Sequence, residues 1–367
     1  MSLDPSAWRG AHQLSATVHT TFPGNSFLET DLVSDVIIPG HPVQTIDANL
    51  VNPWGIAYAP NGPFWINDNN ATPSAVTVYD GNGNPVTVFN SHNVIGFEAP
   101  AANPTGEVFN PSGGFMVDGQ PAKFLFATEN GTIAAWSPGT SDGKADVVID
   151  NSNTSSGFGI GEVYKGLAIG QSHGDTFLFA SDFRDGRVEV YNNKFEPVKS
   201  FTDPTIPKAY APFNVQVLDH HLFVTFAVRN STGHDDLRGK HRGFVDEFDF
   251  KGNLIARVAS HGALNSPWGL AIAPTGFGKF AGDLLVGNFG DGRINAFDLH
   301  TDTFVGTLRD AAGHPIHIDG LWALIAGNHG MHGHPDSIYF TAGINGESDG
   351  LFGRLSFNHH AAADLHM

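Results

Sequence analysis

The stretch SPWGLAIAPTGFGKFAGDLLVGNFGDGRINAFD, residues 266–298, contains the pattern that decides the fold. It opens with the short motif SPWG, which leads into an apolar run. Two further runs, LLVGN (284–288) and RINAFD (293–298), follow after short loops, and a fourth, TFVGTL (303–308), comes next. These runs have the length and the alternation of β-strands, and the Asp-Gly pair before RINAFD is a hairpin signal. One unit therefore predicts a sheet of four antiparallel strands.

The same unit recurs six times along the 367 residues. Its leading motif is found as NPWG (52–55), NPSG (110–113), VYKG (163–166), APFN (211–214), SPWG (266–269) and IDG (318–320). Successive motifs end 58, 53, 48, 55 and 51 residues apart. A period of about 50 residues is typical of propeller blades. We therefore predict an all-β fold, a six-bladed β-propeller of four-stranded blades. The alternative, a β-solenoid or two β-sandwiches, is disfavoured by six equal units.

The last unit lacks a fourth strand, because it ends after LFGRLSF (351–357). The segment FLETDLVSDV (27–36) precedes the first motif and has no blade of its own. We expect it to complete the last blade and so close the ring. The chain would then divide into an N-terminal arm (1–26), one propeller (27–357) and a C-terminal tail (358–367). In the first unit, PVTVFN (85–90) is the predicted fourth strand.

Composition narrows the function classes. The chain has 19 Lys and Arg against 37 Asp and Glu, a formal net charge of −18, so a nucleic-acid partner is not expected. It has no cysteine, which excludes disulfides, thiolate metal sites and a thiol nucleophile. It has no run of about 18 apolar residues, so we expect no membrane span. The sequence MSLDPSAWRG does not begin like a signal peptide.

The repeat also predicts where chemistry would be found. In a propeller, the loops before the first strands and the turns between second and third strands share one face, here called the upper face. They surround the mouth of the axial channel, and we expect a small-molecule ligand in this polar funnel. Residues expected to contact that ligand are Asn52, Asn110, Asn214, Arg229 and Asn288.

Four acids from different units are predicted to converge on this mouth: Asp68, Glu129, Asp182 and Asp319. Carboxylate and amide oxygens form the ligand set that Ca²⁺ or Mg²⁺ prefers, so we expect a divalent metal, Ca²⁺ in the first place. Asp68 and Glu129 are assigned to the metal, Asp182 and Asp319 to catalysis. The alternative is that these side chains cap turns by bonding to nearby backbone N–H groups.

Two further features of this face carry charge. Lys165 stands in VYKG where other units have an aromatic residue or serine; it could act as a charge clamp or a base, or form a salt bridge between blades. The fourth unit has a long insertion, Arg229–Arg242, which contains His234, Asp235 and Asp236. Histidine beside carboxylates can bind a metal or relay protons, with at most two of the three acting together. A solvated loop is the alternative.

We predict catalytic roles for Lys165, Asp182, Arg184, His234 and Asp319, and metal binding by Asp68, Glu129, Asp235 and Asp236. The string His329, His332, His334 could bind a transition metal, but its loop belongs on the opposite face. No phosphate loop, dinucleotide fingerprint or G-x-S-x-G elbow occurs, so no nucleotide or flavin is expected.

Several stretches resemble a family of largely uncharacterised bacterial propellers related in style to NHL-repeat proteins. They include NLVNPWGIA (49–57), EVYKGLAIG (162–170), FASDFRDGRVEVY (179–191), YAPFNVQ (210–216) and the stretch from 264 to 298. The resemblance implies the propeller fold and an exported protein, periplasmic or extracellular. Some members carry a C-terminal PEP-type sorting signal; the residues 358–367 do not resemble one, so anchoring to the envelope is not expected.

Three functions remain open at this stage. The density of ionisable groups at one mouth favours a metal-assisted hydrolase or lyase. The absence of a recognised catalytic motif favours a binding or scaffold protein of the cell envelope. An electron-transfer protein would need the His-rich loop to fold around a metal. A deep polar mouth would support the enzyme, and a plugged one the scaffold.

Overall fold

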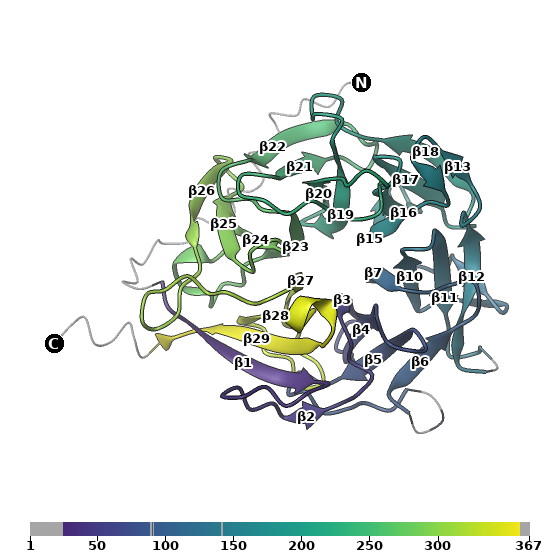
Figure 1. Cartoon of the computed structure of the whole chain (residues 1–367). Helices are drawn as coiled ribbons and strands as arrows, with labels where there is room; N and C mark the ends of the chain where they lie inside the picture. Colours follow the sequence, from purple (N-terminus) through teal and green to yellow (C-terminus); the bar gives the residue numbers. More distant parts are fainter. Residues whose placement is uncertain (1–24, 89, 91, 141, 360–367) are drawn as a thin grey trace.

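The structure, a computed structural model, describes residues 25–88, 90, 92–140 and 142–359. Six blades stand around a central axis, which Figure 1 views end-on, and the first two are joined at their outer strands into one sheet. The six-bladed propeller predicted from the repeat is confirmed. Apart from residues 25, 26, 358 and 359, the predicted arm and tail lie outside the described residues.

Each blade has four main strands, numbered here from the axis outward. The first, inner strands are β3 (Pro53–Tyr58), β7 (Pro104–Phe109), β15 (Tyr164–Ser172), β19 (Tyr210–Leu218), β23 (Pro267–Ile272) and β27 (Leu321–Ala326). The second strands are β4 (Phe64–Asp68), β10 (Phe124–Thr128), β16 (Asp175–Asp182), β20 (His221–Val228), β24 (Leu284–Asn288) and β28 (Ser337–Ala342). The third strands are β5 (Ala75–Tyr79), β11 (Thr132–Trp136), β17 (Arg187–Asn192), β21 (Phe244–Phe248), β25 (Ile294–Asp298) and β29 (Leu351–Phe357). The outer strands are β6 (Val94–Phe97), β12 (Lys144–Asp150), β18 (Pro197–Phe201), β22 (Leu254–Ser260), β26 (Thr303–Thr307) and β1 (Phe27–Ser34).

The ring closes as predicted, because β1 pairs antiparallel with β29 from Phe27↔Phe357 to Ser34↔Leu351. Figure 1 shows the purple N-terminal strand lying along the yellow C-terminal one. Phe27 is 2% exposed, and its ring lies 4.5 Å from that of Phe277 and 5.8 Å from that of Phe357. The two ends of the chain therefore share one blade and one apolar cluster.

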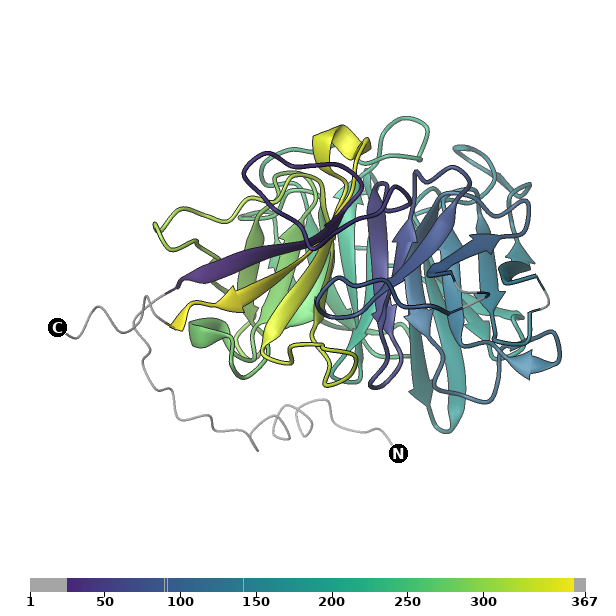
Figure 2. The same cartoon turned by 90° about the horizontal axis from the view of Figure 1, so that it is seen from below.

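Shorter elements decorate the blades. They are β2 (Thr45–Ile46) beside β1, the ribbons β8 (Met116–Val117) with β9 (Gln120–Pro121) and β13 (Ser155–Ser156) with β14 (Gly159–Ile160), the turn η2 (Gly278–Phe280), and α2 (Ile344–Glu347). The helix α2 marks the upper face, at the top of Figure 2.

The predicted fourth strand of the first blade was wrong. Residues 85–88 form no ladder: Pro85 makes a bridge to Tyr79, the Val86 N–H donates to the Val78 carbonyl, and the Val88 N–H donates to the His92 carbonyl. The outer strand is β6 instead, which pairs with Ala75–Thr77 and also, in parallel, with β12 of the next blade. The Val-Thr-Val alternation at 86–88 is a strand pattern, but the ladder position is taken by a later segment.

Inner strands converge at the axis, which explains the glycine of the leading motif. A Cβ atom on Gly55 would lie 2.3 Å from the Thr105 carbonyl oxygen, and one on Gly106 would lie 2.3 Å from the Leu167 nitrogen. Such distances are far below van der Waals contact, so only glycine fits. A Cβ on Gly113, by contrast, would meet nothing within 4 Å.

The prediction of NPSG (110–113) as the leading motif of the second blade was therefore wrong, because this string follows the inner strand instead of preceding it. The inner strand of the second blade follows Asn103 in the stretch NPTG (103–106), and Asn110 comes after that strand ends. Asn52 and Asn103 both have positive φ, 48° and 56°, a conformation that asparagine tolerates. Asn110 lies at the opposite end of β7, where its side chain donates to the Gly114 and Ala122 carbonyls.

Candidate functional site

Aromatic rings close the axial channel. The third residue of the motif in the first five blades is Trp54, Thr105, Lys165, Phe213 or Trp268, and Trp322 follows the motif IDG in the sixth. The Trp54 and Trp322 rings stack at 3.5 Å, and Trp322 also stacks on Phe289 at 3.7 Å. Trp268 packs edge-on against both tryptophans, at 6.3 and 5.8 Å. We call Trp54, Phe213, Trp268, Phe289 and Trp322 the aromatic plug; all are at most 3% exposed.

Lys165 is the one charged member of this inner ring and is only 2% exposed. Its Nζ lies 4.9 Å from the centre of the Trp54 ring and forms an ion pair with Glu129. The Lys165 carbonyl accepts a hydrogen bond of 3.1 Å from the Trp268 indole. The plug therefore holds both the backbone and the ammonium group of this lysine.

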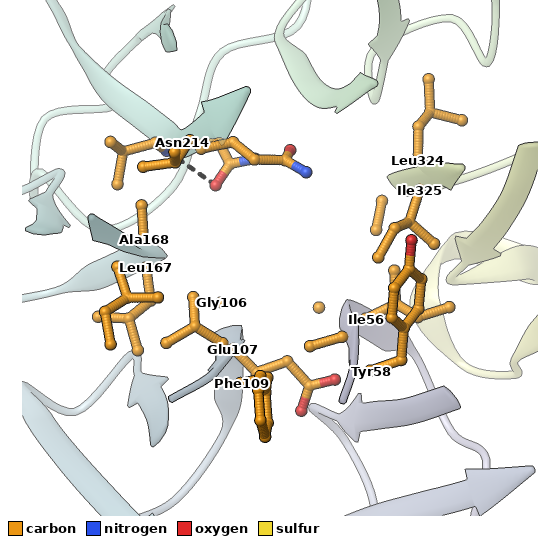
Figure 3. Close-up of a pocket in the computed structure, with 18 of the residues that line it drawn as sticks. Ile56, Tyr58, Gly106, Glu107, Phe109, Leu167, Ala168, Asn214, Leu324 and Ile325 are labelled. Atoms are coloured by element: carbon orange, nitrogen blue, oxygen red, sulfur yellow. Dashed lines mark hydrogen bonds between the residues drawn. The ribbon is translucent and has the colours of Figure 1, made fainter. Parts of the chain in front are cut away.

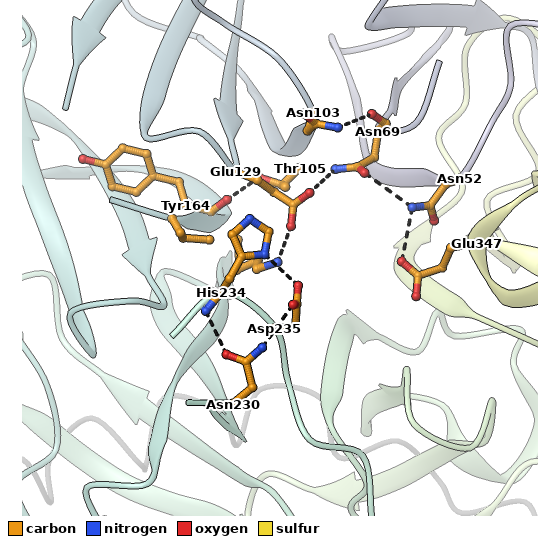
Figure 4. Close-up of polar contacts among 12 residues, drawn as sticks. Asn52, Asn69, Asn103, Thr105, Glu129, Tyr164, Asn230, His234, Asp235 and Glu347 are labelled. Carbon is orange, nitrogen blue, oxygen red and sulfur yellow. Dashed lines mark hydrogen bonds and ion pairs between the residues drawn. The ribbon is translucent and has the colours of Figure 1, made fainter. Parts of the chain in front are cut away.

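A cluster of polar side chains lies on the upper face (Figure 4), and Lys165 belongs to it through its ion pair with Glu129. Ligand atoms of Glu129, His234 and Asp235 all lie within 4.8 Å of one another. Glu129 also accepts a 3.0 Å bond from the Asn69 amide, and His234 Nδ1 lies 2.7 Å from Asp235 Oδ1. We call Asn69, Glu129, Lys165, His234 and Asp235 the mouth cluster.

The insertion of the fourth blade holds His234 and Asp235 in place through Asn230. The Asn230 carboxamide oxygen accepts from the backbone N–H of Thr232 and of His234, both at 3.1 Å. Its amide group donates to Asp235 Oδ2 at 3.1 Å, and its backbone N–H donates to the Asp235 carbonyl at 2.8 Å. The loop is thus ordered by its own hydrogen bonds, while many of its side chains, including that of Asp235, stay exposed to solvent as the solvated-loop alternative expects.

A second line of polar groups borders the mouth cluster. The Asn52 amide donates to Glu347 at 3.3 Å, and Arg238 forms an ion pair of 2.8 Å with the same carboxylate. The Arg238 guanidinium also lies 3.9 Å above the Phe289 ring. The sequence analysis did not select Glu347 or Arg238. Alignment of the sixth blade would have shown that Glu347 lies in a turn between second and third strands.

Charge around the mouth is predominantly negative. The hydrogen bond from His234 lowers the pKa of Asp235, so that carboxylate is charged at neutral pH. Burial raises the pKa of Asp236 and of Glu347. Lys165 pairs with Glu129, and Arg238 pairs with Glu347. A cation or a hydrogen-bond donor would therefore be attracted here.

A second set of three carboxylates, those of Glu162, Asp182 and Asp185, surrounds one arginine of the protein. The Arg187 guanidinium lies 3.1, 3.7 and 2.9 Å from these three side chains, respectively. Asp182 also accepts from the Val163 and Asp185 backbone N–H groups. Burial raises the pKa of Asp182 to about 7. Asp182 thus bonds to nearby backbone N–H groups, as the alternative of a turn-capping side chain expects.

A pocket of about 370 Å³ joins this region to the mouth cluster. Glu129 and His234 line one part of it, Glu162 and Arg184 another. The Arg184 guanidinium donates to the Gly161 carbonyl at 2.6 Å. Burial raises the pKa of Glu162 to about 8, so a neutral carboxyl group borders this pocket at neutral pH.

The side chains of two predicted acids, Asp68 and Asp319, lie away from the mouth cluster. Asp68 is fully buried, and burial raises its pKa well above the usual range. Asp319 accepts from the Asn345 N–H at 2.9 Å and lines a separate pocket with Glu29 and His41.

Three of the predicted ligand contacts make bonds to carbonyl groups instead. The Arg229 guanidinium donates to the Arg184 carbonyl at 2.6 Å, and the Asn288 amide donates to the Ala263 carbonyl at 2.8 Å. The Asn214 amide donates to the Trp268 carbonyl at 2.8 Å.

The His-rich loop lies on the lower face and packs against the first blade. His332 Nδ1 lies 2.9 Å from Asp80 Oδ2, and His334 Nε2 lies 3.4 Å from Asn82 Oδ1. Among the described residues, these histidines do not belong to either group of three potential metal ligands. No helix in the described part of the chain is long and apolar enough to cross a bilayer.

Comparison with known proteins identifies viral relatives. The chain is 32% identical over 320 residues to "Uncharacterized protein R648" of Acanthamoeba polyphaga mimivirus, covering 84% of this chain and 76% of that protein. It is 31% identical over 328 residues to "Uncharacterized protein L690" of the same virus, covering 84% and 81%. The resemblance had implied bacterial relatives, whereas these two relatives are viral. No family model matches the chain.

Two solved structures share the fold. Virginiamycin B lyase from Staphylococcus aureus superimposes with a TM-score of 0.51 and 14% identity, over 91% of this chain and 99% of that one. A protein of unknown function from Bacteroides thetaiotaomicron gives a TM-score of 0.51 and 13% identity, over 84% and 70%. At such identities the likeness concerns the fold alone.

Proposed function

We propose, from the premise that this chain belongs to the family of these two mimivirus proteins, that the mouth cluster is its functional site. The site would bind a small polar molecule together with a divalent cation. The observation that carries the proposal is the meeting of Glu129, His234 and Asp235 within 4.8 Å, beside a buried lysine.

The residues present are compatible with a divalent cation. Two carboxylates and an imidazole are common metal ligands, and the imidazole suits a transition metal better than the predicted Ca²⁺. Lys165 already contacts one Glu129 oxygen, so a cation would have to share that carboxylate with the ammonium group. We therefore expect reversible binding rather than a permanently held ion. A bound cation would polarise an oxygen of the ligand.

The chain's own groups fit hydrolase or lyase chemistry. Lys165 would stabilise negative charge that develops on the ligand, since its ammonium is desolvated and fixed by the plug. His234 would transfer a proton, because its partner Asp235 orients the ring. The fold shared with virginiamycin B lyase is compatible with this class but adds no residue to the argument.

A non-catalytic binding protein is the second candidate, and the aromatic plug favours it. The predicted channel is closed directly beneath the mouth cluster, so a ligand would rest on the surface rather than enter a deep funnel. An exported location remains a prediction from the bacterial resemblance.

Calorimetric titration with Zn²⁺, Mn²⁺ and Ca²⁺, on protein purified without a histidine tag, tests the proposal. We expect one site per chain, lost in Glu129→Gln/Asp235→Asn and retained in the matched control Glu196→Gln/Asp175→Asn. The two control acids are exposed and lie away from the mouth. Mass-spectrometric metal content provides a second readout. Absence of binding to wild type, or equal binding by both double variants, would exclude the metal-assisted function and leave the scaffold.

A further inference from the structure

Two cavities in the described part of the chain differ in character. The one on the axis below the aromatic plug measures about 270 Å³ and has a mostly apolar wall, which includes Tyr58, Phe109 and Leu324 (Figure 3). The other is the pocket of about 370 Å³ beside the mouth cluster, and its wall is largely polar. A polar pocket next to a potential metal site can select its ligand by charge, so the charges that line it indicate what it would hold.

Two arginines beside the polar pocket have no carboxylate partner. Arg184 lines the pocket, and neither this half-buried residue nor the half-buried Arg229 makes an ion pair among the described residues. The nearby carboxylates of Asp182 and Asp185 pair with Arg187 instead. Charged groups that are removed from water are normally paired. In a chain with a formal net charge of −18, two unpaired guanidinium groups at one pocket therefore indicate an anionic ligand.

The contacts of Arg184 leave part of its guanidinium available. Its Nη1 donates to the Gly161 carbonyl at 2.6 Å and also to the Ile160 carbonyl, and Arg229 donates to the Arg184 backbone carbonyl at 2.6 Å. The Arg184 Nε is buried, whereas its Nη2 is neither buried nor hydrogen-bonded within the described part of the chain. The side chain is therefore fixed in place while two N–H groups remain able to donate to an anion.

The carboxyl groups that line the pocket are neutralised. Glu129 is paired with Lys165. Glu162 is uncharged at neutral pH, because burial raises its pKa to about 8. Asp235, the charged carboxylate of the mouth cluster, is not among the residues that line the pocket, although its partner His234 is. Arg184 thus leaves the lining with one uncompensated positive charge.

We infer that the molecule bound at the mouth cluster is a small carboxylate, whose negatively charged group is held by Arg184 in the polar pocket. The inference rests on the proposed function, since it names the class of ligand that the same site receives. One uncompensated positive charge matches the single charge of a carboxylate better than the charge of a phosphate group, about −1.5 to −2 at neutral pH. The volume lies within the usual range of ligand pockets, about 300–1,000 Å³. A second oxygen of the ligand would contact the cation proposed between Glu129, His234 and Asp235.

Titration with 4-hydroxybenzoate and 4-hydroxybenzamide tests the inference, because the two molecules differ in charge but hardly in shape. Saturation-transfer nuclear magnetic resonance gives the affinities, first on metal-free protein and then with Zn²⁺. We expect metal-free wild type to bind the carboxylate about tenfold more tightly than the amide, and Zn²⁺ to tighten the binding further. If Zn²⁺ does not bind, the proposed metal site is excluded, whereas the metal-free titration still decides the inference.

Three variants separate charge from structure. Arg184→Gln should weaken 4-hydroxybenzoate about tenfold and leave the affinity for the amide unchanged, so the preference disappears. Ser152→Asp keeps Arg184 and its contacts but adds a carboxylate to the lining, and should weaken 4-hydroxybenzoate about threefold or more. Arg309→Gln is the matched control and should bind as wild type does, since Arg309 is exposed and also donates to a carbonyl group, that of Gly313.

The inference would be overturned if metal-free wild type bound 4-hydroxybenzoate without saturation or no more tightly than the amide. An undiminished preference for the carboxylate in both Arg184→Gln and Ser152→Asp would overturn it as well. Tighter binding of phenyl phosphate than of 4-hydroxybenzoate would overturn the assignment to carboxylates.

Discussion

Replacing Lys165 with methionine should destabilise the protein by about 3 kcal/mol. Methionine retains most of the apolar contact with Trp54 but leaves Glu129 without its cation. Breaking a buried ion pair by removing one partner typically costs about 3–5 kcal/mol. Glu129 is 12% exposed and keeps its hydrogen bond from Asn69, which places the expected loss at the lower end of this range.

Thermal unfolding followed by circular dichroism gives the measurement. An unfolding entropy of about 2.1 cal/mol/K per residue amounts to about 0.8 kcal/mol/K for this chain, so 3 kcal/mol corresponds to about 4 °C in Tm. The double variant Lys165→Met/Glu129→Gln should lose only about 1–2 kcal/mol, because it leaves no unpaired charge. Lys199→Met, on an exposed strand of the same blade, is the control and should change Tm little.

The reasoning would be refuted by a Lys165→Met protein with the wild-type Tm. It would also be refuted if the double variant lost as much stability as Lys165→Met and Glu129→Gln lose in sum. Either result would mean that the pair contributes no coupling energy and that Lys165 is held by the aromatic plug alone.

Three further outcomes are expected. Phe27→Ala should cost about 3–5 kcal/mol and increase proteolysis of the N-terminus, because this buried ring holds the closing strand in the last blade; unchanged denaturant and proteolysis profiles would contradict that. Trp322→Ala should cost a similar amount and diminish the near-ultraviolet circular dichroism, since it removes the centre of the plug, whereas an unchanged spectrum would count against stacking. The free energy of unfolding should fall as pH rises from about 5 to 8, because the folded state holds a proton on Glu162 (pKa about 8) that the unfolded state, with a pKa near 4.5, has released. Denaturant titrations at several pH values should show a weaker dependence of this free energy on pH in Glu162→Gln than in wild type. Equal dependence on pH in the two proteins would exclude Glu162 as the source.

The repeat could be predicted because it is a local property. Alternation within runs of five to eight residues specifies strands, and a period of about 50 residues specifies blades, without knowledge of any long-range contact. Ring closure followed from counting, since a blade with three strands needs a fourth. The error at Asn110 arose where two similar strings, NPTG and NPSG, occur close together. Only the close approach of neighbouring inner strands at Gly106 distinguishes them.

Part of the candidate site was also predictable. The upper-face rule placed Glu129, Lys165 and the His234-Asp235 pair near one mouth, and the structure brings these residues together. The same rule selected Asp68 and Asp319, whose side chains lie elsewhere. The rule locates a backbone position, whereas the direction of a side chain depends on which face of the strand it occupies and which partner it meets.

The sequence by itself determined most of the strands, the number of blades, the closure of the ring and the loop that carries His234. The tertiary structure alone decided that the axis is closed by stacked rings, that Lys165 is buried against Glu129, and that a separate apolar cavity lies beneath. The physical reason is the range of the interactions. Strand formation is governed by neighbours along the chain, whereas Trp54 and Trp322 meet only after six twisted blades have brought distant strands to one axis.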